Sequence, residues 1–114
     1  MEIIQHTDGE ITVIELAGEI DLYNSVELKS LLTAVIEKRQ YRIVLNMKRV
    51  SYMDSTAIGV LVHVLNLLKK YRGALVLAET PASIEKVLRL TKLVTFFQLW
   101  SSEAEALESM RGGG

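Results

Sequence analysis

The first twenty residues carry the pattern of two β-strands joined by a tight turn. Apolar and β-branched residues dominate positions 3–4 and 11–16, and the polar stretch between them contains the step Asp8-Gly9. An Asp-Gly step between two such runs is a strong signal for a short hairpin loop. The pattern therefore predicts an N-terminal antiparallel hairpin, with Gly18 ending its second strand.

Apolar residues then recur at the spacing of a helix. They stand at i, i+3, i+4, i+7 and i+8 and share one face, namely Leu28, Leu31, Leu32, Val35 and Ile36. This stripe predicts an amphipathic helix packed on a core. Asn24 has Glu27 three residues later, the spacing of a capping box, so we expect the helix to begin near Asn24.

The rest of the chain alternates between buried strands and helices. Continuous apolar runs at 43–45 and 74–78 are typical of strands covered on both faces. Between them a helix is expected from Asp54 or Ser55 to about Tyr71, with Gly73 as its C-terminal cap. After 74–78, the step Thr80-Pro81 opens a third helix with Pro in its first turn. A short strand at 94–99 and a helix at 102–110 complete the expected elements.

This order of elements indicates one fold class. Strands that alternate with helices require crossover connections, so the sheet should be largely parallel after the hairpin. We expect a single α/β domain over residues 1–111, with a mixed sheet and about four helices. The glycines at 112–114 are expected to form a flexible tail.

Composition removes several classes of function. The chain has 114 residues, no cysteine and a net charge of −1, which excludes disulfides and thiol chemistry and gives no excess of positive charge. The short basic clusters at 38–39, 48–49 and 69–72 are interpreted as solvated helix ends and loops, so no nucleic-acid partner is expected. No apolar run reaches the ~20 residues of a membrane span, and the N-terminus lacks the features of a signal peptide. We expect a soluble cytoplasmic protein without a membrane partner.

Catalysis finds no support in the residues. A serine nucleophile at Ser55 would need a base, and His63 would lie ~12 Å further along the same helix. His6 stands early in the chain, and nothing places it near Ser55. The sequence has no Gly-x-Ser-x-Gly elbow, no phosphate-binding glycine loop and no cluster with metal spacing. We therefore expect no enzyme activity, no cofactor and no metal.

The strongest functional candidate is the segment 54–59. Asp54, Ser55 and Thr56 fall where a buried strand gives way to a helix, a junction at which α/β proteins commonly place functional groups. The same three residue types also form ordinary helix caps. Gly59, inside the helix, is either a packing concession or a point of close approach for a partner. Local chemistry leaves both interpretations open.

The helix that follows is apolar around much of its circumference. Two stripes are present, one of Ile58, Leu61, Val62 and Leu65 and one of Val60, Val64, Leu67 and Tyr71. Such a helix is buried in the core or partly covered by a partner. Core packing is one interpretation, and contact with a partner or a weak homodimer is the other.

At this point the sequence resembles a known family. Residues 50–61 resemble the signature of the STAS domain, specifically that of bacterial anti-sigma-factor antagonists, and 17–21 and 90–93 extend the resemblance over residues 3–110. It implies a STAS-like fold and a partner-switching regulator. Ser55 would be phosphorylated by a cognate anti-sigma factor that acts as an ATP-dependent serine kinase, and a PP2C-type phosphatase would restore it. The unphosphorylated protein would bind the anti-sigma factor and free the sigma factor.

The resemblance also implies a partner surface. Its expected members are Asp21, Asn24, Asp54, Ser55, Thr56, Ala57 and Gly59. Ala57 departs from the family, which usually has Gly there, and adds a methyl group beside the acceptor serine. One alternative is a STAS scaffold or accessory subunit, in a signalling or lipid-transport complex, that is not phosphorylated. A more distant alternative is a small-molecule or nucleotide sensor.

Overall fold

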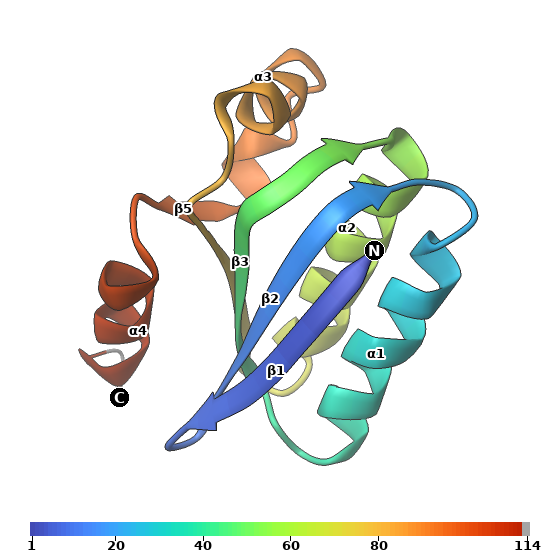
Figure 1. Ribbon diagram of the computed structural model, residues 1–114. Coiled ribbons are helices and arrows are strands. Elements are labelled where there is room, and N and C mark those ends of the chain that lie inside the picture. Colours follow the sequence, from blue (N-terminus) through green and yellow to red (C-terminus); the bar gives the residue numbers. More distant parts are fainter. Residues whose placement is uncertain (113–114) are drawn as a thin grey trace.

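The computed structural model describes residues 1–112, which form a five-stranded sheet in the order β1-β2-β3-β4-β5 (Figure 1). The strands are β1 (Glu2–Asp8), β2 (Ile11–Ile20), β3 (Arg42–Met53), β4 (Ala74–Ala78) and β5 (Gln98–Trp100). β1 runs antiparallel to β2, and every later neighbour is parallel. The predicted hairpin and mixed sheet are confirmed. The hairpin loop is Gly9-Glu10, where Gly9 adopts a positive φ of 63° that suits glycine.

Helices cover both faces of this sheet. They are α1 (Ser25–Glu37), α2 (Ser55–Lys69), α3 (Ala82–Leu90) and α4 (Glu103–Gly112), with a short 3₁₀ helix η1 (Val94–Phe96) before β5. α1 and α2 pack side by side on one face, and α4 lies on the opposite face (Figure 1). The expected flexible tail at 112–114 begins at the last residue of α4, and 113–114 lie outside the described residues.

Two apolar clusters hold these layers together. The larger one lies between the sheet and α1, α2 and α3, and its fully buried members include Ile14, Leu45, Leu32, Leu61 and Leu77. The smaller one joins α4 to the other face of the sheet through Ala106 and Met110. In α2, the half-buried Val60, Val62, Leu65 and Leu67 pack against the larger cluster, so core packing accounts for most of this helix's apolar surface.

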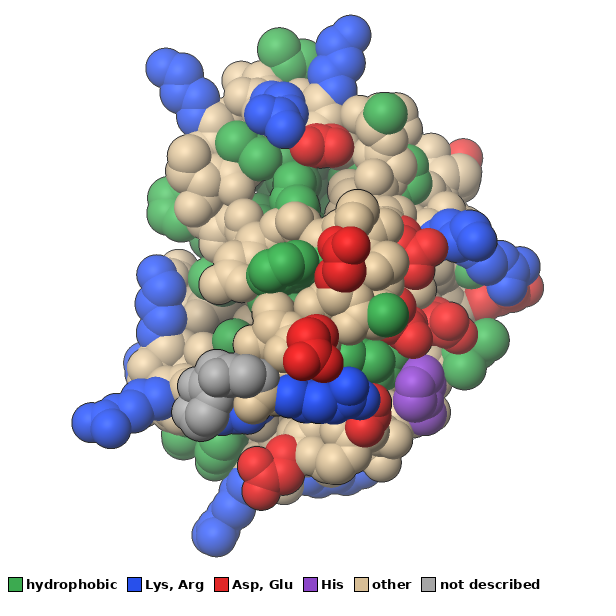
Figure 2. Space-filling model, turned by 90° about the vertical axis from the view of Figure 1, so that its left-hand side faces the viewer, with side chains coloured by type: hydrophobic (Ala, Val, Ile, Leu, Met, Phe, Trp, Pro, Cys, Tyr) green, Lys and Arg blue, Asp and Glu red, His purple; other side chains and the backbone are tan. Residues whose placement is uncertain are grey.

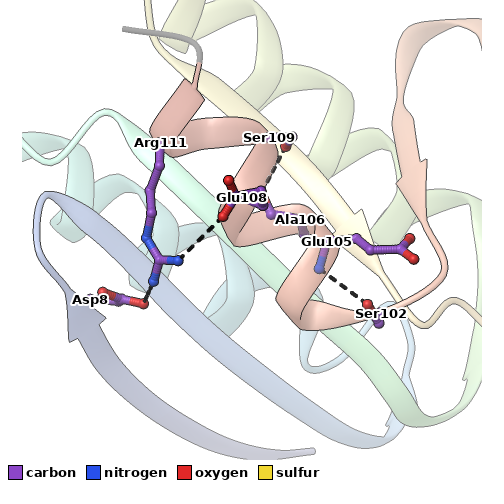
Figure 3. A network of polar contacts seen from close by, with 7 residues as sticks. All are labelled: Asp8, Ser102, Glu105, Ala106, Glu108, Ser109 and Arg111. Atoms are coloured by element: carbon purple, nitrogen blue, oxygen red, sulfur yellow. Dashed lines mark hydrogen bonds and ion pairs between the residues drawn. The ribbon is translucent and has the colours of Figure 1, made fainter.

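α4 is also fixed by polar contacts to the start of the fold (Figure 3). Arg111 forms ion pairs with Asp8 and Glu108, and the Arg42 guanidinium donates to the backbone oxygen of Met110 at 3.0 Å. Seen from the side of α4, acidic, basic and hydrophobic side chains are interspersed (Figure 2). Among residues 1–112, no helix combines the length and hydropathy needed to span a bilayer.

The structure corrects the expected extent of β3. The continuous apolar run predicted a strand at 43–45, but β3 continues to Met53. In the C-terminal half of β3, buried and exposed side chains do not alternate one by one. The reason is that the register with β2 shifts twice, between Glu15 and Ala17 and between Gly18 and Glu19. The buried side chains Met47, Val50 and Met53 consequently stand three residues apart. β3 therefore leads directly into Asp54.

The last expected strand is also displaced. Residues 94–96 form η1 rather than a strand, because their neighbouring N–H groups bond locally: Phe96 donates to Leu93 and Phe97 to Val94. Lys92 adopts a left-handed φ of 62°, which turns the chain at the end of α3. The strand itself is β5, which begins at Gln98.

The end of α2 differs from expectation as well. Arg72, with a φ of 55°, occupies the left-handed position that Gly73 was expected to take. The N–H of Gly73 donates to the oxygen of Leu68 at 2.9 Å, as in a Schellman motif. Glycine is needed at 73 for space: a Cβ there would lie 2.3 Å from the backbone oxygen of Tyr41.

Candidate functional site

The candidate residues meet at one edge of the sheet, where β2 and β3 end. Ile20 pairs with Met53, the last residue of each strand, and the N–H of Asp54 donates to the oxygen of Ile20 at 3.2 Å. Asp21 and Asp54 thus leave neighbouring strands at the same level. This edge holds the carboxyl ends of parallel strands, the usual location of sites in α/β sheets.

Asp54 begins α2 as its N-cap. Its backbone is extended, with a φ of −91° and a ψ of 177°, and its carboxylate accepts the N–H of Ala57 at 2.9 Å. α2 therefore begins at Ser55, and Ser55 and Thr56 are both exposed on its first turn. The two interpretations of this segment coexist, because Asp54 makes the cap while the neighbouring Ser55 is presented to solvent.

Replacing Asp54 with Ala is expected to lower the free energy of unfolding by about 1 kcal/mol, because one N–H of the first turn loses its acceptor. Asp54→Asn is the matched control, since Asn caps about as well and should stay close to wild type. Urea unfolding monitored by circular dichroism measures both. Equal midpoints for wild type and Asp54→Ala would contradict the capping role.

The loop between β2 and α1 is braced by its own side chains. The Asp21 carboxylate accepts the N–H groups of Tyr23 and Asn24, and the Asn24 side chain accepts the N–H of Asp21 at 2.7 Å. The Asn24 amide also donates to the oxygen of Glu19 at 2.8 Å. Asn24 precedes α1 as expected. The predicted capping box is wrong, because the Asn24 side chain bonds within this loop and accepts no N–H group of the helix.

Sequence reasoning missed an apolar patch on this loop. Leu22, Tyr23 and Val26 are exposed by 57%, 88% and 68%, and we call these three residues the loop patch. They lie beside the acidic Asp21 and Glu27. One signal was available: Leu22 and Tyr23 precede α1, and Val26 lies off its buried stripe. Exposed apolar residues grouped beside a functional candidate are typical of an interaction surface.

The remaining two candidates differ in accessibility. Ala57 is fully buried, so its methyl group faces the core and a partner cannot reach that side chain. Gly59 is exposed, and a Cβ placed there would meet no heavy atom within 4 Å. The packing of α2 therefore does not require glycine at 59, which leaves room for close approach from outside.

The two histidines lie on β1 and within α2, and not at the ends of β2 and β3. His63 is exposed on α2 and His6 is exposed on β1. Within residues 1–112, no group of three or more His, Cys, Asp or Glu side chains could hold a metal ion. The arrangement can present a serine hydroxyl and an apolar loop to another protein.

Comparison with known proteins gives the site a context. A family model described as the STAS domain matches residues 2–106. The anti-sigma-B factor antagonist of Bacillus subtilis is 35% identical over 91 residues, which cover 79% of this chain and 81% of that protein.

Solved structures agree on the fold. The anti-sigma factor antagonist SpoIIAA in its unphosphorylated form matches with a TM-score of 0.83 and 25% identity, over 97% of each chain. The phosphorylated form of the Bacillus cell fate determinant SpoIIAA matches with a TM-score of 0.76 and 22% identity, over 96% of this chain and 99% of that one.

Proposed function

Because this chain belongs to the STAS domain family, we propose that it is an anti-sigma-factor antagonist whose binding is switched by phosphorylation of Ser55. In its unphosphorylated form it binds an anti-sigma factor and releases a sigma factor. The anti-sigma factor acts as the serine kinase, and a PP2C-type phosphatase reverses the modification. The role is regulatory and needs no catalysis by this chain.

The observation that carries the proposal is the setting of Ser55. Its side chain is exposed in the first turn of α2, beside a cap made by Asp54 and across from the loop braced by Asp21 and Asn24. A kinase can reach a serine in such a position without unfolding the helix. The relatives point the same way, since one is named an anti-sigma-B factor antagonist and SpoIIAA is described in both phosphorylation states.

The physical effect of the phosphate differs inside and outside the domain. It adds about −1.5 to −2 charges, which the free N–H groups at the N-terminus of α2 tolerate. At an interface, the same charge joins the carboxylates of Asp21 and Asp54 and must be desolvated or repelled. The switch is therefore a local electrostatic and steric block, and the sheet keeps its arrangement.

Ala57 bears on the alternative of a scaffold that is not phosphorylated. Its methyl group points into the core and lies 0% exposed, so it does not obstruct the surface around Ser55. The departure from the family's glycine therefore gives no support to the scaffold alternative.

The loop patch supplies a further prediction. Tyr23→Ala is expected to weaken binding to the anti-sigma factor by about tenfold, because exposed aromatic side chains often dominate interface energies. Its free energy of unfolding should stay within about 0.5 kcal/mol of wild type, since the side chain is 88% exposed. Ile4→Ala, on the distant strand β1, is the matched control and should bind as wild type. Titration calorimetry with the anti-sigma factor measures both; equal affinities for the two variants would remove the loop patch from the interface.

Competition tests the proposed activity itself. A preformed complex of sigma factor and kinase-type anti-sigma factor from the same organism is mixed with excess unphosphorylated protein and separated by size-exclusion chromatography. The proposal expects free sigma factor and a new complex that contains this chain. Intact sigma complexes with every such anti-sigma factor of that organism would contradict it.

A further inference from the structure

A basic recess lies at the N-terminal end of β3. The 12 residues of this strand separate it from the start of α2, where Ser55 lies. At the N-terminal end, the chain enters β3 and β4 from the ends of α1 and α2, and the recess, with a volume of about 490 Å³, opens between these connections. Its walls include three arginines and two tyrosines: Arg39, Arg42, Arg72, Tyr41 and Tyr71. None of these residues takes part in the surface around Ser55.

The fold brings two short basic clusters together at this recess. The rings of Tyr41 and Tyr71 stack with their centroids 4.5 Å apart and their planes within 4°. The N–H of Ala74 donates to the oxygen of Tyr41 at 2.8 Å. These contacts join the connection that carries Arg39 to the one that carries Arg72. Clusters that are separate and short along the chain thus form one surface.

The three positive charges of the recess are only partly balanced by carboxylates. Among residues 1–112, the arginines that form ion pairs are Arg49, Arg89 and Arg111, all outside the recess. Glu10 is the single acidic residue that lines it. Arg42 is held in place by its bond to the oxygen of Met110. Like charges gathered in a concave site repel one another and favour an incoming anion.

The helix dipoles explain some of the positive charges in the recess but not all of them. Basic residues near the C-termini of α1 and α2 interact favourably with the helix dipoles. This accounts for a positive charge at Arg39 and Arg72, but Arg42 begins a strand. Arg39 and Arg72 also adopt left-handed φ values of 63° and 55°, in a position that usually carries glycine.

We propose that this recess binds an oligoanion that carries phosphoryl groups. Guanidinium groups pair with phosphate oxygens in bidentate geometry, and three of them match a ligand with two or more negative charges. The volume of the recess lies within the usual range for small-molecule sites. A free oligophosphate and the clustered headgroups of an anionic lipid surface share this chemistry. The inference is independent of the proposed role of Ser55, because the two sites lie at opposite ends of β3.

Three glycine substitutions make a matched test. Arg39→Gly and Arg72→Gly each remove one cation from the recess, and Lys92→Gly removes one from the end of α3, where Lys92 has the same left-handed conformation. Glycine is favoured at all three positions, so each variant should melt at or above the temperature of wild type. Misfolding is thereby separated from loss of binding.

Titration calorimetry of the full chain with tripolyphosphate at low ionic strength measures the binding. Wild type and Lys92→Gly are expected to bind alike, and Arg39→Gly and Arg72→Gly about tenfold more weakly each, as expected for the loss of a charge-assisted hydrogen bond. Equal weakening in Lys92→Gly would overturn the proposal, because it would indicate a general charge effect. Citrate binding as tightly as tripolyphosphate would overturn the phosphoryl assignment.

Sedimentation with vesicles distinguishes the two sources of phosphoryl groups. Binding to phosphatidylglycerol vesicles that is lost in Arg39→Gly supports a lipid headgroup as the ligand. Tripolyphosphate binding without vesicle binding supports a free oligophosphate. If wild type binds neither tripolyphosphate nor these vesicles, the recess is not an anion site.

Discussion

Replacing Ser55 with Asp is expected to weaken binding to the anti-sigma factor by at least about tenfold, whereas Ser55→Ala should bind as tightly as wild type. A tenfold loss corresponds to about 1.4 kcal/mol, which one desolvated or repelled charge readily supplies at an interface. The exposed position of Ser55 and the neighbouring carboxylates of Asp21 and Asp54 make this surface sensitive to added negative charge. Calorimetry with the purified anti-sigma factor measures the affinities.

Ser55→Asp should not destabilise the fold. A negative charge in the first turn of a helix is favoured by the free N–H groups, so the unfolding midpoint of Ser55→Asp should equal or exceed that of wild type. Ser83→Asp is a matched control, because Ser83 is exposed in the first turn of α3. That variant should keep full affinity. Wild-type affinity in Ser55→Asp would contradict an electrostatic block at this residue.

The largest expected change in stability comes from Gly73→Ala, which should lower the free energy of unfolding by about 1–3 kcal/mol. The new methyl carbon would lie 2.3 Å from the oxygen of Tyr41, a backbone atom that also accepts the N–H of Ala74. Relief of the clash must therefore move backbone and weaken the contact between two connections. Urea unfolding monitored by circular dichroism gives the change in midpoint.

Gly59→Ala is the matched control for that measurement, and it should raise the free energy of unfolding instead of lowering it. A Cβ at 59 meets nothing within 4 Å, and alanine is favoured over glycine inside a helix by up to about 1 kcal/mol. The variant should be more stable than wild type. A Gly73→Ala variant as stable as wild type would show that Gly73 does not approach Tyr41 closely. Weakened partner binding by Gly59→Ala, despite its higher stability, would place Gly59 in the interface.

Local pattern was sufficient for some elements of the fold. The Asp8-Gly9 step was sufficient to predict the hairpin, because the turn depends on the positive φ of Gly9, a local property of glycine. The stripe from Leu28 to Ile36 gave α1, since one helix face is buried along its whole length. The length of β3 could not be predicted, because two register shifts against β2 change the spacing of its buried residues. Those shifts depend on the pairing of distant segments.

Local pattern was also sufficient for part of the candidate site. Asp54 and Ser55 stand at a junction between strand and helix that the flanking apolar pattern indicates. The role of Asn24 was misassigned because its side chain bonds to the backbone of Glu19 and Asp21, a loop geometry that spacing alone does not show. The loop patch and the burial of Ala57 depend on which surfaces other elements cover. Such information is absent from any single stretch of sequence.

The decisive measurement for a phosphorylation switch at Ser55 is to locate the phosphate. Wild type and Ser55→Ala are incubated with ATP and the cognate kinase-type anti-sigma factor, the site of modification is located by mass spectrometry, and the affinity of the modified protein is then measured. One phosphate is expected on Ser55 and none on the Ser55→Ala variant, and the modified protein should bind at least about tenfold more weakly. A phosphate on another residue, or a protein phosphorylated at Ser55 that binds as tightly as before, would contradict it.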